Sequence, residues 1–209
     1  MSHNDPFIFL IDIDGTLIGD ITYHVVEWEI LHRFEPRNLK AFKQHLIQTL
    51  RSCLLRPHFA DFVSQVKQAL PHSEFYVYTA SDLKWAQYVV PCIEAACGIK
   101  FNRPIFTRKQ CHSTSNGLKK SLSRIAPTIY SKLKTRYGFK NSSQVYNHMM
   151  LVDNTNVLYD KESRKWIRCP TFESSCVHDV LRNLDQKIFS DNAASICMRN
   201  VQSGMVGCF

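Results

Sequence analysis

Two carboxylates stand two residues apart directly after a short apolar run near the start of the chain, at Asp12 and Asp14. Such a pair can divide the work of a phosphoryl transfer, because one carboxylate can attack phosphorus while the other, partly protonated, delivers a proton to the leaving oxygen. Gly15 follows them and would let the backbone turn sharply beside a bound phosphate. The alternative is a simple turn that ends a strand, since Asp and Gly are common turn residues.

Polar residues that follow two further apolar runs could complete a phosphate site. Thr79, Ala80 and Ser81 offer hydroxyl and backbone N–H groups near a helix start, where anions bind. Asp153 and Asn154 supply hard oxygen donors of the kind that Mg²⁺ prefers. Each group also has a simpler interpretation, a helix N-cap for the first and a plain turn for the second.

A lysine between these groups could balance their charge. Lys119 and Lys120 precede a helical segment, where an ammonium could neutralise both a bound phosphate and an attacking carboxylate. The alternative is a solvated surface lysine, because the chain is basic, with a formal net charge of +8. The same charge would attract polyanions such as nucleic acid, which makes a polyanion contact a second kind of partner to consider.

The elements that must position these residues alternate along the chain. Hydrophobic patterns predict short buried strands over 7–11, 75–78, 104–106, 149–152 and 166–167. Helical spacing predicts helices over 21–50 (as two helices around Pro36), 59–70, 82–96, 118–137 (interrupted near Pro127) and 177–184. This alternation favours an α/β fold with an open parallel sheet, in which ligands bind beyond the carboxyl ends of the strands.

Length and composition favour one intracellular domain. A chain of 209 residues with 44% hydrophobic residues can bury its own core. Its eight cysteines lack the close paired spacing of a zinc site, which favours reduced thiols. The apolar run over 7–11 is far too short to span a membrane, so no membrane partner is expected. We therefore expect a cytoplasmic or nuclear protein that is not secreted, and the oligomeric state stays open.

The order of these features resembles a known set of motifs. An Asp-x-Asp-Gly-Thr run, a threonine after a strand, a lysine and an acidic pair, in that order, resemble the four motifs of the haloacid dehalogenase (HAD) superfamily. Within it, the segments 55–58, 78–81 and 151–154 are most similar to phosphatases of the RNA polymerase II C-terminal domain and their small, NLI-interacting-factor-like relatives. The resemblance spans roughly residues 7–172.

The resemblance implies a fold and a division of the chain. The expected fold is α/β, a Rossmann-like HAD core with a central parallel sheet flanked by helices and a small helical insertion after the first motif. The phosphatase domain would cover residues 1–190, with the insertion or cap at 21–50, and residues 191–209 would form a C-terminal tail.

The resemblance also implies a role for each matching residue. Asp12 would form the phosphoaspartate, and Asp14 would act first as general acid and then as general base. Thr79 would contact the phosphate. Lys120 is favoured over Lys119 as the site lysine, because the residues that follow it match the family segment better.

Cofactor and substrate contacts are implied in the same way. The expected cofactor is Mg²⁺, held by Asp12, Asp14 (through its carbonyl), Asp153 and Asn154. Substrate contacts are expected from Gly15, Thr16, Ala80, Ser81 and Arg108. A guanidinium can hold a phosphate through two parallel hydrogen bonds, although a solvated arginine is the alternative at position 108.

These residues favour a magnesium-dependent phosphomonoester hydrolase over a dehalogenase, because phosphoryl transfer uses the second aspartate as an acid. A protein serine/threonine phosphatase acting on a phosphorylated protein or peptide is the first hypothesis. A phosphatase of nucleic-acid ends or small metabolites is the second, and a catalytically silent module that binds phosphorylated partners is the third. The stretch between Lys120 and Asp153 is longer than in the small phosphatases, which leaves the substrate more open than the chemistry.

Overall fold

The computed structural model describes residues 6–115 and 117–174. Within them the chain forms a five-stranded sheet in the order β3-β2-β1-β6-β7, with every strand pair parallel. These strands are β1 (Ile8–Ile11), β2 (Glu74–Tyr78), β3 (Asn102–Phe106), β6 (Met149–Asp153) and β7 (Trp166–Arg168). A separate antiparallel hairpin consists of β4 (His112–Thr114) and β5 (Gly117–Lys119).

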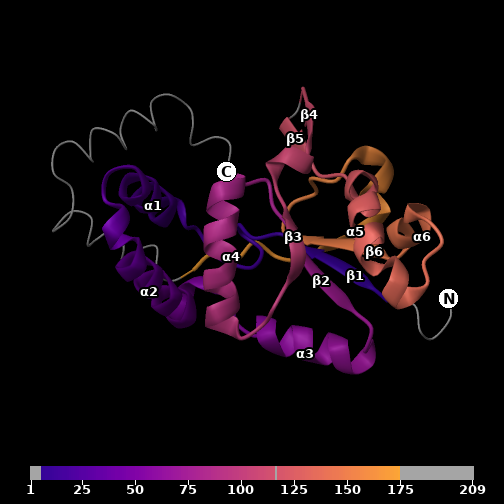
Figure 1. Cartoon of the computed structure of the whole chain (residues 1–209), viewed down its shortest axis with the longest axis horizontal. Coiled ribbons are helices and arrows are strands. Elements are labelled where there is room, and N and C mark those ends of the chain that lie inside the picture. Colours follow the sequence, from indigo (N-terminus) through magenta and orange to yellow (C-terminus); the bar gives the residue numbers. More distant parts are fainter. Residues whose placement is uncertain (1–5, 116, 175–209) are drawn as a thin grey trace.

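Helices cover both faces of the sheet (Figure 1). They are α1 (Thr22–Phe34), α2 (Leu39–Thr49), α3 (Phe59–Ala69), α4 (Leu83–Cys97), α5 (Leu122–Tyr137) and α6 (Ser142–Asn147). Short 3₁₀ segments run over Pro36–Asn38, Arg108–Gln110 and Asp160–Lys165, and a π-helical turn over Leu50–Leu54. The predicted α/β fold with a parallel sheet flanked by helices is confirmed.

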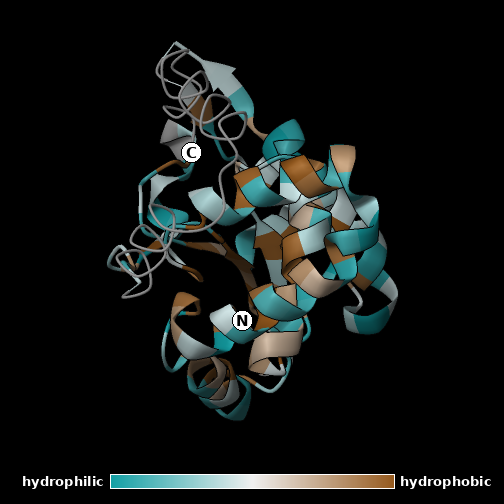
Figure 2. Cartoon of the chain, turned by 90° about the vertical axis from the view of Figure 1, so that its left-hand side faces the viewer, coloured by the Kyte–Doolittle hydropathy of each residue, from teal (hydrophilic) through white to brown (hydrophobic). Residues whose placement is uncertain are grey.

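The alternation of side chains along each strand produces two hydrophobic cores. In β1, Phe9 and Ile11 point to the side of α1, α2, α3 and α4, while Ile8 and Leu10 point to the side of α5 and α6. Figure 2 shows these strands as a brown centre between helices whose outward surfaces are largely teal or pale. Because β1 is buried on both faces, it has the continuous apolar run that the sequence displays.

The two helices after the first motif pack against α4. The ring of Trp28 in α1 lies 5.5 Å from that of Trp85, and the ring of Phe42 in α2 stacks on Tyr88 at 5.9 Å. The Tyr88 hydroxyl also donates to the backbone carbonyl of Leu39 at 3.0 Å. The predicted pair of helices around Pro36 is therefore present as a flank of the sheet domain (Figure 1).

The prediction of one helix over 118–137 was wrong at its start. Residues 117–119 belong to the hairpin instead, where they pair with 112–114, and Ser121 caps α5 by accepting from the N–H of Arg124. The helix is also continuous through Pro127, since Ile125 and Ile129 on either side stay buried in the core. The predicted helix at 177–184 and the boundary at 190/191 lie outside the described residues.

Free thiols occur at Cys92, Cys97, Cys111 and Cys169, as predicted. No helix in the described part of the chain is long and apolar enough to cross a membrane.

Two phenylalanines allow a matched test of the packing between α1, α2 and α4. Phe42 is 4% exposed and Phe34 is 71% exposed, so the same substitution removes a buried ring in one case and a solvated ring in the other. We expect Phe42→Ala to lower the free energy of unfolding by about 3 kcal/mol and Phe34→Ala by less than about 0.5 kcal/mol. Urea unfolding measures both, and equal losses would contradict the described packing.

Candidate functional site

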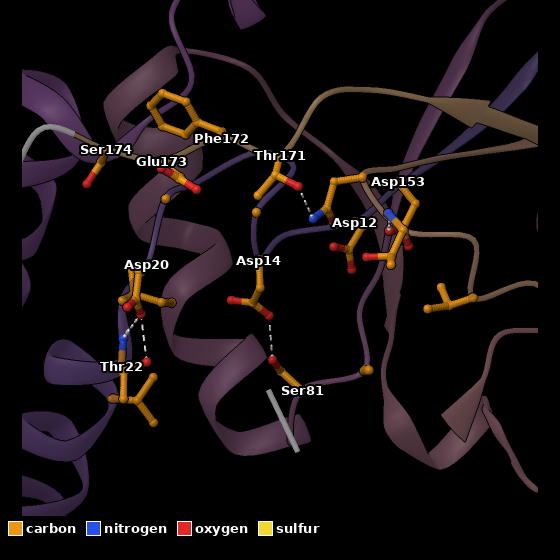
Figure 3. A pocket seen from close by; sticks show the side chains of 18 of the residues that line it. Asp12, Asp14, Asp20, Thr22, Ser81, Asp153, Thr171, Phe172, Glu173 and Ser174 are labelled. Carbon is orange, nitrogen blue, oxygen red and sulfur yellow. Dashed lines mark hydrogen bonds between the residues drawn. The ribbon is translucent and has the colours of Figure 1, made fainter. Parts of the chain in front are cut away.

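The candidate functional site lies at the carboxyl ends of the three central strands. Because β1 pairs in parallel with both β2 and β6, the residues that follow these strands meet at one edge of the sheet. There they line an open pocket of about 820 Å³. Its inner wall carries Asp12, Asp14, Ala80, Ser81, Lys120, Asp153 and Asn154, and its outer wall includes Asp20, Ile21, Val25, Trp85 and the segment 171–174 (Figure 3).

A tight turn presents the first two carboxylates. The N–H of Asp12 donates to the carbonyl of Val152 at 3.0 Å, which extends the β1–β6 pairing by one residue. The carbonyl of Ile13 then accepts from the N–H groups of residues 16–18, and Gly15 adopts φ +69°. This left-handed conformation suits glycine and reverses the chain, so that Asp12 and Asp14 both reach the pocket (Figure 3).

Lys120 lies between two buried carboxylates. Its Nζ is 2.5 Å from Oδ1 of Asp12 and 2.8 Å from Oδ2 of Asp153, and the lysine is only 2% exposed. Lys119 points elsewhere, donating to the carbonyl of Asn156 at 3.4 Å. Of the two lysines that the sequence offered, the structure brings Lys120 into the pocket.

Burial and charge act against each other in this trio. Burial raises the pKa of Asp12, the ammonium of Lys120 opposes that rise, and the neighbouring carboxylates of Asp153 and Asp14 add to it. Burial lowers the pKa of Lys120, but the two carboxylates outweigh burial and hold it above its ordinary value. Lys120 therefore stays protonated, and its charge is available to a phosphate that approaches Asp12.

Asp14 is held apart from the trio by hydroxyl groups. Ser81 Oγ donates to its Oδ2 at 2.8 Å, and Thr79 Oγ1 lies at 3.4 Å from the same atom (Figure 3 draws the first contact). Burial raises the pKa of Asp14, and the hydrogen bond from Ser81 opposes that rise. A carboxyl with a raised pKa keeps its proton at higher pH, as a general acid requires.

The residues after β2 differ in how they meet the pocket. Ala80 and Ser81 line it, whereas Thr79 is fully buried and its hydroxyl accepts from the N–H of Ser81 at 3.0 Å. Arg108 is exposed outside the lining, with its Nε donating to the carbonyl of Ala80 at 3.0 Å. The structure thus places Arg108 beside the entrance and Thr79 behind Asp14.

Asn154 joins the first turn to the end of β6. Its Oδ1 accepts from Thr16 Oγ1 at 3.2 Å, its N–H donates to the same hydroxyl at 3.0 Å, and its Nδ2 donates to Thr171 Oγ1 at 3.1 Å. The hydroxyl of Thr16 is therefore engaged by Asn154, and Thr16 itself is buried. A Cβ on Gly15 would lie 2.7 Å from Asn154 Nδ2, so only glycine fits this contact without displacing the amide.

The donor set fits a divalent cation by its chemistry and charge. Asp12, Asp14 and Asp153 carry three carboxylates into a pocket where Lys120 supplies one ammonium. Burial is the main cause of the raised pKa of Asp12, and the carboxylates of Asp153 and Asp14 add to it. Among the described residues, however, no three His, Cys, Asp or Glu side chains form a ready cluster for a metal ion.

Arg56 is a site residue that the motifs did not assign. Its guanidinium donates to the backbone carbonyls of Thr16, Gly15 and Pro170, and it lies 5.1 Å from the ring centre of Phe172. It thereby connects the turn that carries Asp12 and Asp14 to the segment that forms the outer wall. Arg56 lies in the segment 55–58, which resembles the family. That resemblance was a sequence signal for this residue, but it did not indicate which groups Arg56 would contact.

A family comparison identifies the chain as a member of a phosphatase family. A family model described as NLI interacting factor-like phosphatase matches residues 7–198. A solved structure described as Fcp1, an essential RNA polymerase II CTD phosphatase, is 18% identical with a TM-score of 0.46, covering 80% of this chain and 42% of that chain. This chain thus spans less than half of that protein's length. A comparison with curated proteins finds no match.

Two glycines with the same backbone conformation test the contact with Asn154. Gly15 and Gly138 both have φ +69°, but a Cβ on Gly138 would meet no atom within 4 Å. We expect Gly138→Ala to cost about 1 kcal/mol from backbone strain alone, and Gly15→Ala to cost at least about 1 kcal/mol more, because the Asn154 amide must move. Urea unfolding of both variants measures the difference, and equal costs would contradict the described contact.

Proposed function

Because the chain belongs to the NLI interacting factor-like phosphatase family, we propose that it hydrolyses phosphomonoesters through an aspartyl phosphate formed on Asp12. The observation that carries the proposal is the position of Lys120, 2.5 Å from Asp12 and 2.8 Å from Asp153. A buried ammonium there offsets the charge of the nucleophile and of an incoming phosphate. Asp14, on the same turn, supplies the second carboxyl that the chemistry needs.

The first half of the reaction transfers the phosphoryl group to the protein. An Oδ atom of Asp12 attacks phosphorus in line with the leaving group, and the bond from phosphorus to the ester oxygen breaks. Asp14 in its protonated form delivers its proton to that oxygen, which leaves as an alcohol. Lys120 stabilises the charge on the transferred group throughout.

The second half restores the nucleophile. Asp14, now ionised, takes a proton from a water molecule, and the resulting hydroxide attacks the phosphorus of the aspartyl phosphate. The bond between phosphorus and the Asp12 oxygen breaks, inorganic phosphate leaves, and Asp12 is again a carboxylate. Asp14 is thereby protonated for the next cycle, so one residue serves both halves.

Magnesium is part of the proposal. Mg²⁺ would be held by the carboxylates of Asp12 and Asp153, the carbonyl of Asp14 and the amide oxygen of Asn154, directly or through water. When bound, it supplies positive charge that balances the phosphate oxygens. The excess of carboxylates over ammonium groups in the pocket supports this assignment. The substrate contacts also stay predictions; they are expected from Gly15, Thr16, Ala80, Ser81, Arg108 and Thr79.

We propose a phosphoserine or phosphothreonine side chain of a protein as the substrate. The pocket continues beyond the carboxylates along Ile21, Val25, Trp85 and Phe172, which leaves room for residues next to a phosphorylated side chain. The net charge of +8 favours a second candidate, a phosphate at a nucleic-acid end. A silent binding module is less favoured, because binding alone does not require the arrangement of Asp12, Lys120 and Asp14.

Replacement of the nucleophile tests the reaction. We expect Asp12→Asn to lower the turnover of para-nitrophenyl phosphate by at least about 10³-fold, because an amide cannot attack as a carboxylate. Asp61→Asn, at an exposed carboxylate outside the pocket, is the matched control and should keep full turnover. Chelation should remove wild-type turnover and added Mg²⁺ should restore it. Full activity of Asp12→Asn would refute the assignment of the nucleophile. The activity of the wild type on a panel of phosphopeptides and 5′-phosphorylated DNA identifies the substrate class.

The acid role of Asp14 predicts a dependence on the leaving group. We expect Asp14→Asn to lower kcat/KM for a phosphoserine peptide by about 10²-fold to 10⁴-fold, and by less for para-nitrophenyl phosphate, whose leaving group needs little protonation. In the wild type, kcat/KM for the peptide should fall as pH rises through the raised pKa of Asp14, because the acid loses its proton. Equal losses on both substrates would argue against proton donation by Asp14.

A further inference from the structure

The backbone on either side of Lys120 is held by the segment 154–165. Lys120 lies in a connection between β5 and α5, where no helix or strand fixes it. Instead its N–H donates to the carbonyl of Val157 at 2.7 Å, and its own carbonyl accepts from the N–H of Tyr159 at 2.9 Å. Figure 1 shows this segment, in orange, beside the start of α5. The placement of the ammonium therefore depends on how firmly the segment is attached.

Glu162 attaches that segment to the helix that follows Lys120. Its carboxylate is buried, with Oε2 accepting from the N–H of Leu122 at 2.8 Å and Oε1 from the N–H of Ser123 at 2.9 Å. It forms no ion pair with any other described residue. The positive end of the sixteen-residue helix α5 compensates its charge instead.

Tyr78 completes the support from the side of the sheet. Its hydroxyl accepts from the N–H of Ser121 at 3.1 Å and donates to the carbonyl of Gln110 at 2.9 Å. The three residues after Lys120 thus all donate their N–H groups to buried side chains. A charged acceptor binds such donors more strongly than a neutral one.

We propose that Glu162 is a positioning residue that sets the ammonium of Lys120 between Asp12 and Asp153. It acts by joining the first turn of α5 to the segment that holds the Lys120 backbone, and it touches no reacting atom. Its effect on turnover rests on the proposed function, whereas its effect on the position of Lys120 does not. Glu162→Gln keeps the size of the side chain but presents an amide N–H₂ to one of the two N–H donors.

Glu74 provides the matched control. It is also a buried carboxylate, 6% exposed, and it accepts from Asn102, Arg136 and Tyr137. It lies at the first residue of β2, so it is at the opposite end of the sheet from the pocket. Glu74→Gln therefore disturbs a buried carboxylate that accepts from side chains, including its ion pair with Arg136, without reaching Lys120.

The first test measures the protection of Lys120 directly. Brief labelling of the folded full-length protein with acetic anhydride, followed by peptide mass spectrometry, gives the reactivity of each lysine. We expect Lys120, 2% exposed in the native protein, to react about tenfold faster in Glu162→Gln, because the segment opens more often. In Glu74→Gln it should stay as protected as in the wild type. Unchanged protection in Glu162→Gln, at an equal folded fraction by circular dichroism, would overturn the proposal.

The second test measures catalysis. We expect Glu162→Gln to lower kcat by about tenfold with KM nearly unchanged, because the misplaced ammonium stabilises the transition state less. Glu74→Gln should keep kcat. If Glu162→Gln fails to fold, Glu162→Asp, which keeps the charge but shortens its reach, should show the same changes in smaller measure. An inactive wild type with a deprotected Lys120 in Glu162→Gln would refute the proposed function alone, and a fully active, fully protected variant would refute the positioning role.

Discussion

A buried ammonium between two buried carboxylates is the constraint on which the rest of the structure depends. Removing three charges from water is costly, and the cost is offset only while Lys120 stays within hydrogen-bond distance of both Asp12 and Asp153. These two aspartates follow adjacent parallel strands, and Lys120 comes from a connection 33 residues before Asp153. The register between β1 and β6 and the attachment of that connection must therefore both be held firmly.

The sheet and the segments that cover it hold these side chains in place in different ways. The sheet places Asp12 and Asp153 through backbone pairing of β6 with β1, which is buried on both faces and tolerates little movement. Lys120 and Asp14 are instead held by side chains that bridge segments, with Ser81 on Asp14 and Glu162 beside the start of α5. Lys120 and Asp14 thus depend on contacts between parts of the chain that are distant in sequence.

The sequence allowed the strands and the strand-end residues to be predicted, because these depend on local patterns. The apolar run over 7–11 predicts a buried strand, and parallel strands bring Asp12 and Asp153 to one edge without further information. The family resemblance is confirmed by the match over residues 7–198. The hairpin before Lys120, the contact of Ser81 with Asp14 and the role of Arg56 could not be predicted, because each depends on a partner that no periodicity identifies.

The carbonyl groups around Arg56 connect the turn after β1 to the outer wall of the pocket. A guanidinium whose Nε and Nη2 donate to backbone carbonyls fixes positions of the main chain, whichever side chains those residues carry. The carbonyl of Gly15 accepts both from Arg56 and from the N–H of Phe172, so the turn and the wall share one acceptor. Movement of the wall would then pull on the backbone next to Asp14. Phe172 in the pocket wall is thus joined to the backbone next to Asp14, the proposed general acid, through a main-chain hydrogen bond.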